Sequence, residues 1–158
     1  MSKGLYPFGL NHYRSLKFQK LRKLISKNQR KVKVEGAYGS SLSFLLIDIF
    51  SSINQQIFYI SNSKETASYV YSDIVELIGE INCSFLPSNY RSYTKKIKDE
   101  SNIINRSKTI RDILDKETKI IVTYPEAIFE KIPDEKEIDS KTINIEKGQF
   151  LKINAINE

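Results

Sequence analysis

The sequence is poor in the residues from which many catalytic and metal centres are built. It contains one cysteine (Cys83), one histidine (His12) and no tryptophan. A single cysteine excludes an internal disulfide and a site with several thiolate ligands, and it is typical of a reducing cytosol. With a single histidine, the sequence offers few ligands for a metal ion and few candidates for histidine-based catalysis. We therefore expect a cytoplasmic protein without a bound metal.

A long hydrophobic run is also missing. The longest apolar stretch, from Leu42 to Phe50, is interrupted by Ser43 and Asp48. Because a helix needs about 20 apolar residues to cross a bilayer, this stretch is too short. The first twenty residues show no apolar core followed by a small-residue cleavage site, so we expect no secretory leader. We expect no membrane partner.

Acidic residues are absent from the first 34 positions, which carry ten of the 25 lysines and arginines. The rest of the chain carries all 19 acidic residues against 15 basic ones, a formal charge of −4. Apolar residues at helical spacing predict that residues 1–30 contain a basic amphipathic helix that packs on the domain. Two alternatives stay open for this helix. It could contact nucleic-acid phosphates through Arg22, Lys23 and Lys27, or it could be a membrane-surface or targeting segment.

Strand and helix patterns alternate between residues 31 and 132. Alternating or continuous apolar runs predict four strands, and 3.6-residue periodicity predicts four helices. Such alternation predicts a parallel sheet flanked by helices, the α/β class. After this domain, a charged linker at 133–141 leads to residues 142–158, which alternate again and predict the incomplete start of a second small α+β domain. The predicted strands are 31–36, 55–61, 82–87 and 118–125, and the predicted helices are 41–53, 62–80, 101–116 and 126–132.

Several details accompany these elements. The unbroken apolar centre from Ile57 to Ile60 predicts a strand covered on both faces. The spacing of Asn62 and Glu65 predicts a helix cap, and Gly79 predicts the end of that helix. Pro125 is compatible with the start of the last helix. In the helix at 101–116, the predicted cap is Ser101 or Asp99, and the predicted inward residues are Ile103, Ile104, Ile110, Ile113 and Leu114.

One loop resembles a phosphate-binding loop with its charge removed. Between the strand at 31–36 and the following helix, the pattern G-x-x-x-x-G-K-[ST] is matched at its first glycine and its last hydroxyl. Ser41 replaces the second glycine, and Leu42 replaces the lysine that contacts the β- and γ-phosphates. The alternatives of weak anion binding at the helix start and of an active ATP-binding domain stay open. The residues of this degenerate loop, which we expect not to function, are Gly36, Gly39, Ser40, Ser41, Leu42 and Ser43.

The remaining polar candidates have plain structural explanations. Tyr90, Arg91 and Tyr93 combine aromatic and cationic side chains that could stack on bases, but an ordinary exposed loop is the favoured explanation. Glu126 complements a helix start, and Cys83 is expected to be a small buried hydrophobe. No acidic box of the kind that holds Mg²⁺ follows an apolar strand. We therefore predict no catalytic residues.

Four segments together resemble a known family. "GAYGSSLSFLL", "SNSKETASYVYSDIVELIG", "FLPSNYR" and "IIVTYPEAIFEKI" are similar, in this order and spacing, to the N-terminal module of the bacterial transcription–repair coupling factor, Mfd, and most of all to its Bacteroidetes-type members. That module is similar to the first domain of the excision-repair protein UvrB. The resemblance covers roughly residues 8–155. It implies a P-loop-NTPase-like fold of the UvrB and helicase type.

The resemblance also implies a function. Mfd is an ATP-dependent DNA translocase that dislodges stalled RNA polymerase and recruits UvrA, which starts nucleotide excision repair. Its UvrB-like part has a degenerate phosphate loop and does not hydrolyse ATP. ATP and magnesium would belong to a motor elsewhere, and this chain would have no cofactor.

The implied partners are the other domains of the full-length protein and UvrA, which is reached through the following domain. RNA polymerase and DNA would be contacted by parts absent here. The family's UvrA-contacting residues lie beyond Glu158, so none is assigned in this chain. The resemblance implies either an excised N-terminal piece or a truncated gene product. The alternative from another class is a free-standing basic nucleic-acid-binding module.

Overall fold

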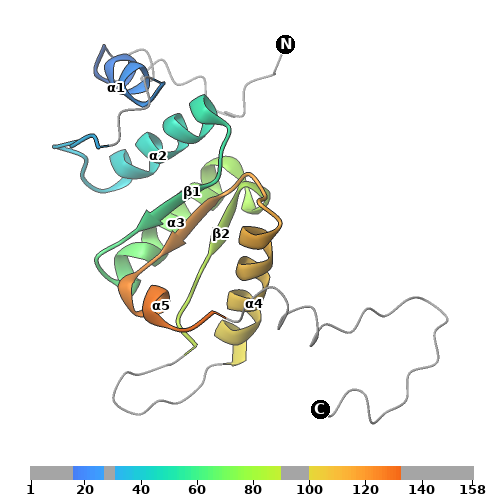
Figure 1. Ribbon diagram of the computed structural model, residues 1–158. Coiled ribbons are helices and arrows are strands. Elements are labelled where there is room, and N and C mark those ends of the chain that lie inside the picture. Colours follow the sequence, from blue (N-terminus) through green and yellow to red (C-terminus); the bar gives the residue numbers. More distant parts are fainter. Residues whose placement is uncertain (1–15, 27–30, 90–99, 133–158) are drawn as a thin grey trace, which may run out of the picture.

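The computed structural model describes residues 16–26, 31–89 and 100–132 (Figure 1). Within these ranges the chain forms a three-stranded parallel sheet flanked by helices, which confirms the predicted α/β class. The elements in chain order are α1 (Leu16–Ser26), α2 (Ser40–Ile53), β1 (Ile57–Ile60), α3 (Lys64–Ile78), the 3₁₀ turn η2 (Glu80–Asn82), β2 (Cys83–Phe85), α4 (Glu100–Leu114), β3 (Ile120–Thr123) and α5 (Pro125–Phe129).

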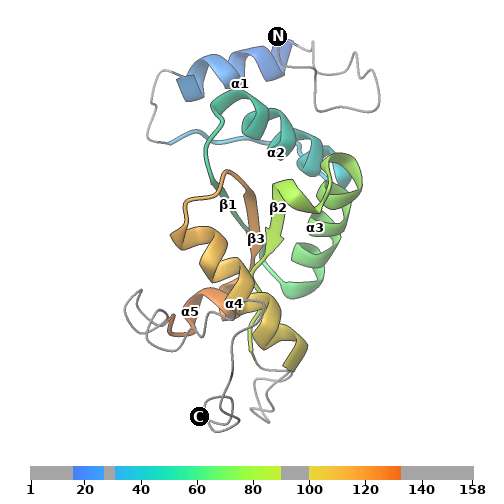
Figure 2. The same ribbon diagram turned by 90° about the vertical axis from the view of Figure 1, so that its right-hand side faces the viewer.

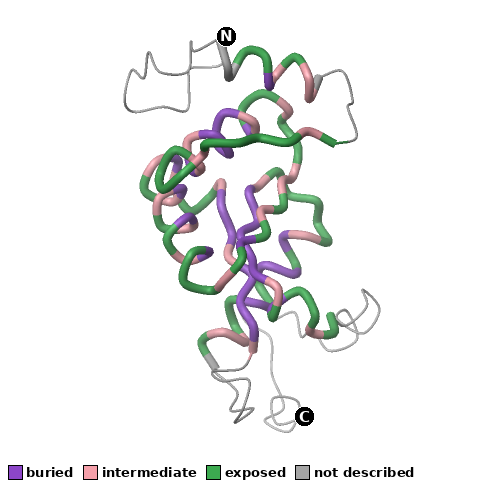
Figure 3. The backbone as a smooth tube through the Cα atoms, turned by 90° about the vertical axis from the view of Figure 1, so that its left-hand side faces the viewer, coloured by how far each residue is buried: buried purple, intermediate pink, exposed green. Residues whose placement is uncertain are grey.

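The sheet has the strand order β1-β3-β2, so the last strand in sequence lies at the centre. Ile57 of β1 and Cys83 of β2 both align with Ile120 of β3. All four residues of β3 are buried (Figure 3). Since the strands are parallel and start at one level, their carboxyl ends lie at a common edge of the sheet.

Two layers of helices cover the sheet unequally (Figures 1 and 2). On one face α2 and α3 enclose the main core, which includes Ile47, Ile74 and Val122. On the other face α4 packs a smaller cluster that joins Ile110 to Ile121. Helix α1 lies on the outer side of α2, away from the sheet. The predicted N-terminal helix therefore packs on a helix and not on the sheet.

The strand predicted at 31–36 does not form. Residues 31–38 have no regular secondary structure, and most of them are exposed. Val34 is 48% exposed, and Lys33 pairs with Glu35 in the solvent. A strand needs hydrogen bonds from a neighbour and a face to bury, and this segment has neither in the described sheet. The chain therefore enters α2 from an extended loop and not from a strand.

The prediction that β1 is covered on both faces is also wrong. Phe58 is 49% exposed and Ile60 is 57% exposed, whereas Ile57 and Tyr59 pack against the main core. Strand β1 is at the edge of the sheet, and α4 packs over β2 and β3. An apolar run with no polar residue does not reveal whether a helix covers its second face.

Helix α4 begins one residue before the predicted range, and its buried face differs from the prediction. Ile104 and Leu114, predicted to point inward, are 69% and 37% exposed. Arg106 and Thr109 are buried instead. Thr109 Oγ1 donates a hydrogen bond of 2.7 Å to the carbonyl of Phe85. Polar side chains occupy this face because the ends of the strands offer carbonyl acceptors.

The ends of α3 and α5 are largely as predicted. Ser63, and not Asn62, caps α3, because its side chain accepts a hydrogen bond from the Thr66 amide. Gly79 ends this helix with φ of 82°, a value that favours glycine. Pro125 is in the first turn of α5. Cys83 is buried, as predicted, and burial raises the pKa of its thiol to about 12.

The guanidinium of Arg106 joins three segments at the carboxyl edge of the sheet. Its Nη1 donates to the carbonyls of Pro87 at 2.9 Å and Ala127 at 2.8 Å. Its Nη2 donates to the carbonyl of Glu130, and its Nε lies 3.5 Å from the Glu130 carboxylate. That carboxylate accepts hydrogen bonds from the Asn89 amide at 3.1 Å and from the Ser88 hydroxyl. Burial lowers the pKa of Arg106, and the Glu130 charge opposes this shift.

Replacing Arg106 with methionine should lower the free energy of unfolding by about 3–5 kcal/mol, because Glu130 would remain partly buried without its partner. Urea titration followed by circular dichroism measures this change. Lys108→Met, at an exposed position of the same helix, is the control and should change stability by less than about 0.5 kcal/mol. Equal stability of the two variants would contradict this role for Arg106.

Candidate functional site

The phosphate-loop pattern at 36–43 covers a short turn and the first residues of α2, which begins at Ser40. Gly36 has φ of +85° and Gly39 has φ of +54°, so both adopt backbone conformations that favour glycine. The Ser41 amide donates to the Tyr38 carbonyl at 3.2 Å, and the Leu42 amide donates to the Gly39 carbonyl at 3.1 Å. Two amides at the helix start are therefore bonded within the loop. In a phosphate loop, such amides hold the ligand.

Ser41, which replaces the second glycine of the pattern, closes the turn. Its hydroxyl donates to the Tyr38 carbonyl at 2.6 Å and accepts from the Tyr38 amide at 2.8 Å. A glycine at this position could make neither hydrogen bond. Serine at this position therefore makes the turn less flexible than glycine would, because its hydroxyl is hydrogen-bonded to Tyr38.

Ser43 matches the hydroxyl of the pattern, but its side chain is directed into the protein. It is fully buried, and its Oγ donates to the Asp73 carboxylate on α3 at 3.0 Å. In a working phosphate loop this hydroxyl binds Mg²⁺. Here it contributes to the contact between α2 and α3, and the groups available at the site do not fit a magnesium nucleotide.

Leu42 is partly buried and packs against the main core cluster. A lysine at the same position would have to place a charged group next to apolar side chains or turn away from them. The leucine therefore does more than remove a positive charge, because it adds apolar contact beneath the loop. This is the feature of the site that differs most from a nucleotide-binding loop.

A cavity of about 450 Å³ lies between α1, residues 32–37 and the start of α2. Its walls are mainly apolar and include Leu21, Leu24 and Leu45, and Lys20 and Lys33 also line it. Lys33 already pairs with Glu35 at 2.5 Å. The cavity offers an apolar surface beside the loop and no cluster of donors suited to a triphosphate.

Of the nucleic-acid candidates, Arg22 has an internal partner. Its Nε donates to Asp48 Oδ2 at 2.9 Å, and its Nη2 contacts the other carboxylate oxygen. The Asp48 side chain is 2% exposed and that of Arg22 is 39% exposed. This bidentate pair ties α1 to α2, and it is the reason that an acid lies within an apolar helix.

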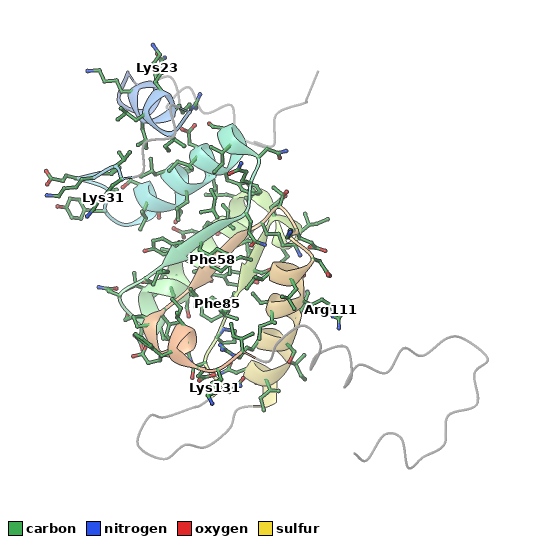
Figure 4. All side chains as sticks on the ribbon, viewed as in Figure 1. Lys23, Lys31, Phe58, Phe85, Arg111 and Lys131 are labelled. Carbon is green, nitrogen blue, oxygen red and sulfur yellow. The ribbon has the colours of Figure 1, made fainter. Side chains whose placement is uncertain are left out.

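The other candidates are less well defined. Lys23 is exposed on α1 and is labelled in Figure 4. Lys27, Tyr90, Arg91 and Tyr93 lie outside the described residues, so their role in nucleic-acid contact stays a prediction.

Three aspartates in the described part of the chain have side-chain partners in the structure. Asp48 binds Arg22, Asp73 accepts from Ser43, and Asp112 accepts from Ser84 at 2.6 Å. The sequence held one signal for the Arg22–Asp48 pair: Asp48 lies within an apolar helix, and a buried carboxylate requires a partner.

Comparisons with known proteins do not identify the chain. No family model matches it, and no curated protein does either. Among the described residues, no group of three or more histidines, cysteines, aspartates or glutamates is placed to hold a metal ion. No helix in the described ranges is long and apolar enough to cross a membrane.

The Arg22–Asp48 pair leads to a stability prediction. Arg22→Ala should lower the free energy of unfolding by about 1–3 kcal/mol, because it leaves a buried carboxylate unpaired while Arg22 itself is partly solvated. Thermal and urea unfolding measure the loss. Lys20→Ala, at an exposed position of the same helix, is the matched control and should change stability by less than about 0.5 kcal/mol.

A salt titration with duplex DNA tests the alternative role of α1 on the same two variants. If α1 binds phosphates, both variants should weaken binding and reduce its salt dependence. If Arg22 acts as an internal anchor, only Arg22→Ala should lower stability, and neither variant should change DNA binding. A stable Arg22→Ala protein with weakened DNA binding would overturn the anchoring role.

Proposed function

We propose that the chain is a non-catalytic UvrB-homology module of a transcription–repair coupling factor. Its role is that of a scaffold in transcription-coupled nucleotide excision repair. It supports the domain that recruits UvrA, and it packs against other domains to restrain the motor. The observation that carries this proposal is Leu42, which packs on the core at the position where an active loop needs a lysine.

The neighbouring serines support the same conclusion. The Ser41 hydroxyl is bonded to Tyr38, and the Ser43 hydroxyl is bonded to Asp73. The two hydroxyls that could have bound phosphate or Mg²⁺ thus have structural partners. An ATPase would need these groups, a lysine and a second acidic ligand at the same site. The proposed module therefore has no cofactor of its own.

The arrangement of the resembling segments also supports the proposal. Residues 85–89 of "FLPSNYR" and the segment "TYPEAIFEK" lie far apart in sequence, but Arg106 connects them through hydrogen bonds to Pro87 and Ala127. The Ser88 amide donates to the Tyr124 hydroxyl at 2.8 Å. Two of the segments on which the resemblance rests therefore belong to one structural unit at the carboxyl edge of the sheet.

Exposed aromatic side chains provide surfaces for other domains. Tyr38 in the loop is 83% exposed, Tyr69 on α3 is 75% exposed, and Phe129 on α5 is 88% exposed. Large apolar side chains at interfaces between domains are buried when the domains pack. These three side chains are available for packing against neighbouring domains of the proposed parent protein.

Nucleotide binding provides the first test. Isothermal titration with ATP and Mg²⁺ should show no binding up to millimolar concentrations, both for the natural chain and for Leu42→Lys. The added lysine should instead lower the free energy of unfolding by about 1–3 kcal/mol, because it removes apolar packing. Ser72→Lys, at an exposed position within α3, is the control and should leave stability nearly unchanged. Micromolar ATP binding by the natural chain would favour the active ATP-binding alternative.

The gene provides the second test. Sequencing beyond the codon for Glu158 should reveal a reading frame that continues into a UvrA-recruiting domain and then into helicase motifs. A reading frame that continues into unrelated domains would overturn the proposed parent protein. This test is independent of how the 158 residues fold.

A further inference from the structure

Residues 31–37 form an extended segment whose backbone is unpaired. The Lys33 ammonium lies 2.5 Å from the Glu35 carboxylate. Side chains two positions apart share one face of an extended backbone and diverge on a helix, so this ion pair indicates a strand-like conformation. Within the described part of the chain, no backbone group of residues 31–37 is hydrogen-bonded to another backbone group. The segment therefore has the shape of a strand but lacks a neighbouring strand.

One face of this segment is apolar and lines a cavity. Val32 and Val34 alternate with Lys33 and Glu35, so the two valines share the face opposite the ion pair. Val32 is half-buried, and Val34 is 48% exposed. Both valines line the cavity of about 450 Å³, whose other walls come from α1 and α2. Apolar side chains of a bound chain would find both space and contacts here.

The surroundings of this apolar face are basic. Helix α1, which lies above the segment in Figures 1 and 2, has the sequence LKFQKLRKLIS, with four cationic residues and no acidic one. Lys31, labelled in Figure 4, is on the segment itself, and Lys20 and Lys33 line the cavity. Glu35 is the only acidic residue among the described residues that line it. Charge complementarity therefore favours an occupant that combines apolar side chains with negative charge.

We propose that residues 31–36 bind an extended segment of a partner protein, which adds to them as a neighbouring strand. The partner segment alternates apolar and acidic side chains. Its apolar side chains lie beside Val32 and Val34 and fill the cavity, and its acidic side chains pair with Lys31 and Lys33. Main-chain hydrogen bonds supply affinity in this mode of recognition, and the alternate side chains supply specificity.

A second copy of the chain fits this site less well than an acidic partner. A symmetric dimer places the same surface of both copies in contact, so the basic surface around α1 would face itself. Like charges in such a position are destabilising. The inference does not rest on the proposed function: loss of the scaffold role leaves this surface unchanged, and failure to bind the partner segment leaves the argument from Leu42 unchanged.

Isothermal titration of the full chain with short peptides tests the proposal. The probe is a capped hexapeptide that alternates glutamate and valine, and it should bind with a dissociation constant below about 1 mM at low ionic strength. A peptide with the same composition, but with its valines and glutamates in two separate blocks, should bind about tenfold more weakly because it lacks the alternation. A peptide that alternates lysine and valine should bind at least as weakly, because its charges repel the lysines of the site.

A variant of the apolar face provides the matched test on the protein. Val34→Asp should weaken binding of the alternating acidic peptide by about tenfold, because it places a charge where apolar side chains meet. Neither core cluster of the described residues includes Val34, so this variant should unfold at the same urea concentration as the natural chain. Gln55→Asp makes the same change in charge at an exposed position beyond the end of α2, and it should bind like the natural chain.

Amide hydrogen exchange measured by NMR locates the bound peptide. Saturation with the alternating acidic peptide should slow exchange of the amides at 32–35 by about tenfold, because strand addition gives them acceptors. The Val122 amide in the central strand serves as the folding control and should exchange at the same rate with and without the peptide.

Three outcomes would overturn the proposal. The first is no binding of the alternating acidic peptide at about 1 mM. The second is equal binding of all three peptides, or equal binding by the Val34→Asp variant, since the site would then be a non-specific apolar surface. The third is slow exchange of the amides at 32–35 before any peptide is added. In that case another part of the same chain already occupies the segment, or a second copy does if protection rises with protein concentration.

Discussion

The buried guanidinium of Arg106 sets the geometry on which much of this structure depends. It donates to the carbonyls of Pro87 and Ala127, and it faces the carboxylate of Glu130. Arg106 thereby holds together three segments: the residues that follow β2, the short helix α5 and the inner face of α4. Because such a charge is stable in the interior only when its donors are satisfied, the three segments have to meet in one arrangement. The path of the chain after β3 follows from this constraint.

A second arginine acts similarly at the opposite side of the molecule. Arg22 binds the buried carboxylate of Asp48 and so attaches α1 to α2. Helix α2 is also the helix that starts at the degenerate loop. With Asp48 bound on its outer side and Ser43 bonded to Asp73 on its inner side, α2 is fixed between α1 and α3. The helix that follows the loop is thus bonded on two sides, as the scaffold role that we propose requires.

The sequence predicted the elements that have their own local pattern. The helix at 64–78 shows a clear apolar stripe, and the strand at 120–123 is a continuous apolar run, so both were predicted correctly. The strand at 31–36 was predicted from alternation alone, and it failed because no neighbouring strand pairs with it in the described sheet. At the site, the sequence showed leucine in place of the pattern's lysine at position 42. It did not show the internal hydrogen bonds of Ser41 and Ser43, because these depend on the position of the Tyr38 carbonyl and on α3.

The sequence alone therefore determined the α/β class, the order of most helices and strands, and the presence of leucine where the phosphate-loop pattern has lysine. These properties follow from local periodicity and from the chemistry of single residues. Only the tertiary structure decided that β3 lies between β1 and β2, that Arg106 is buried, and that Phe58 and Ile60 are left uncovered. Each of these depends on contacts between segments far apart in the chain, and a pattern within one segment does not specify which distant segment will satisfy it.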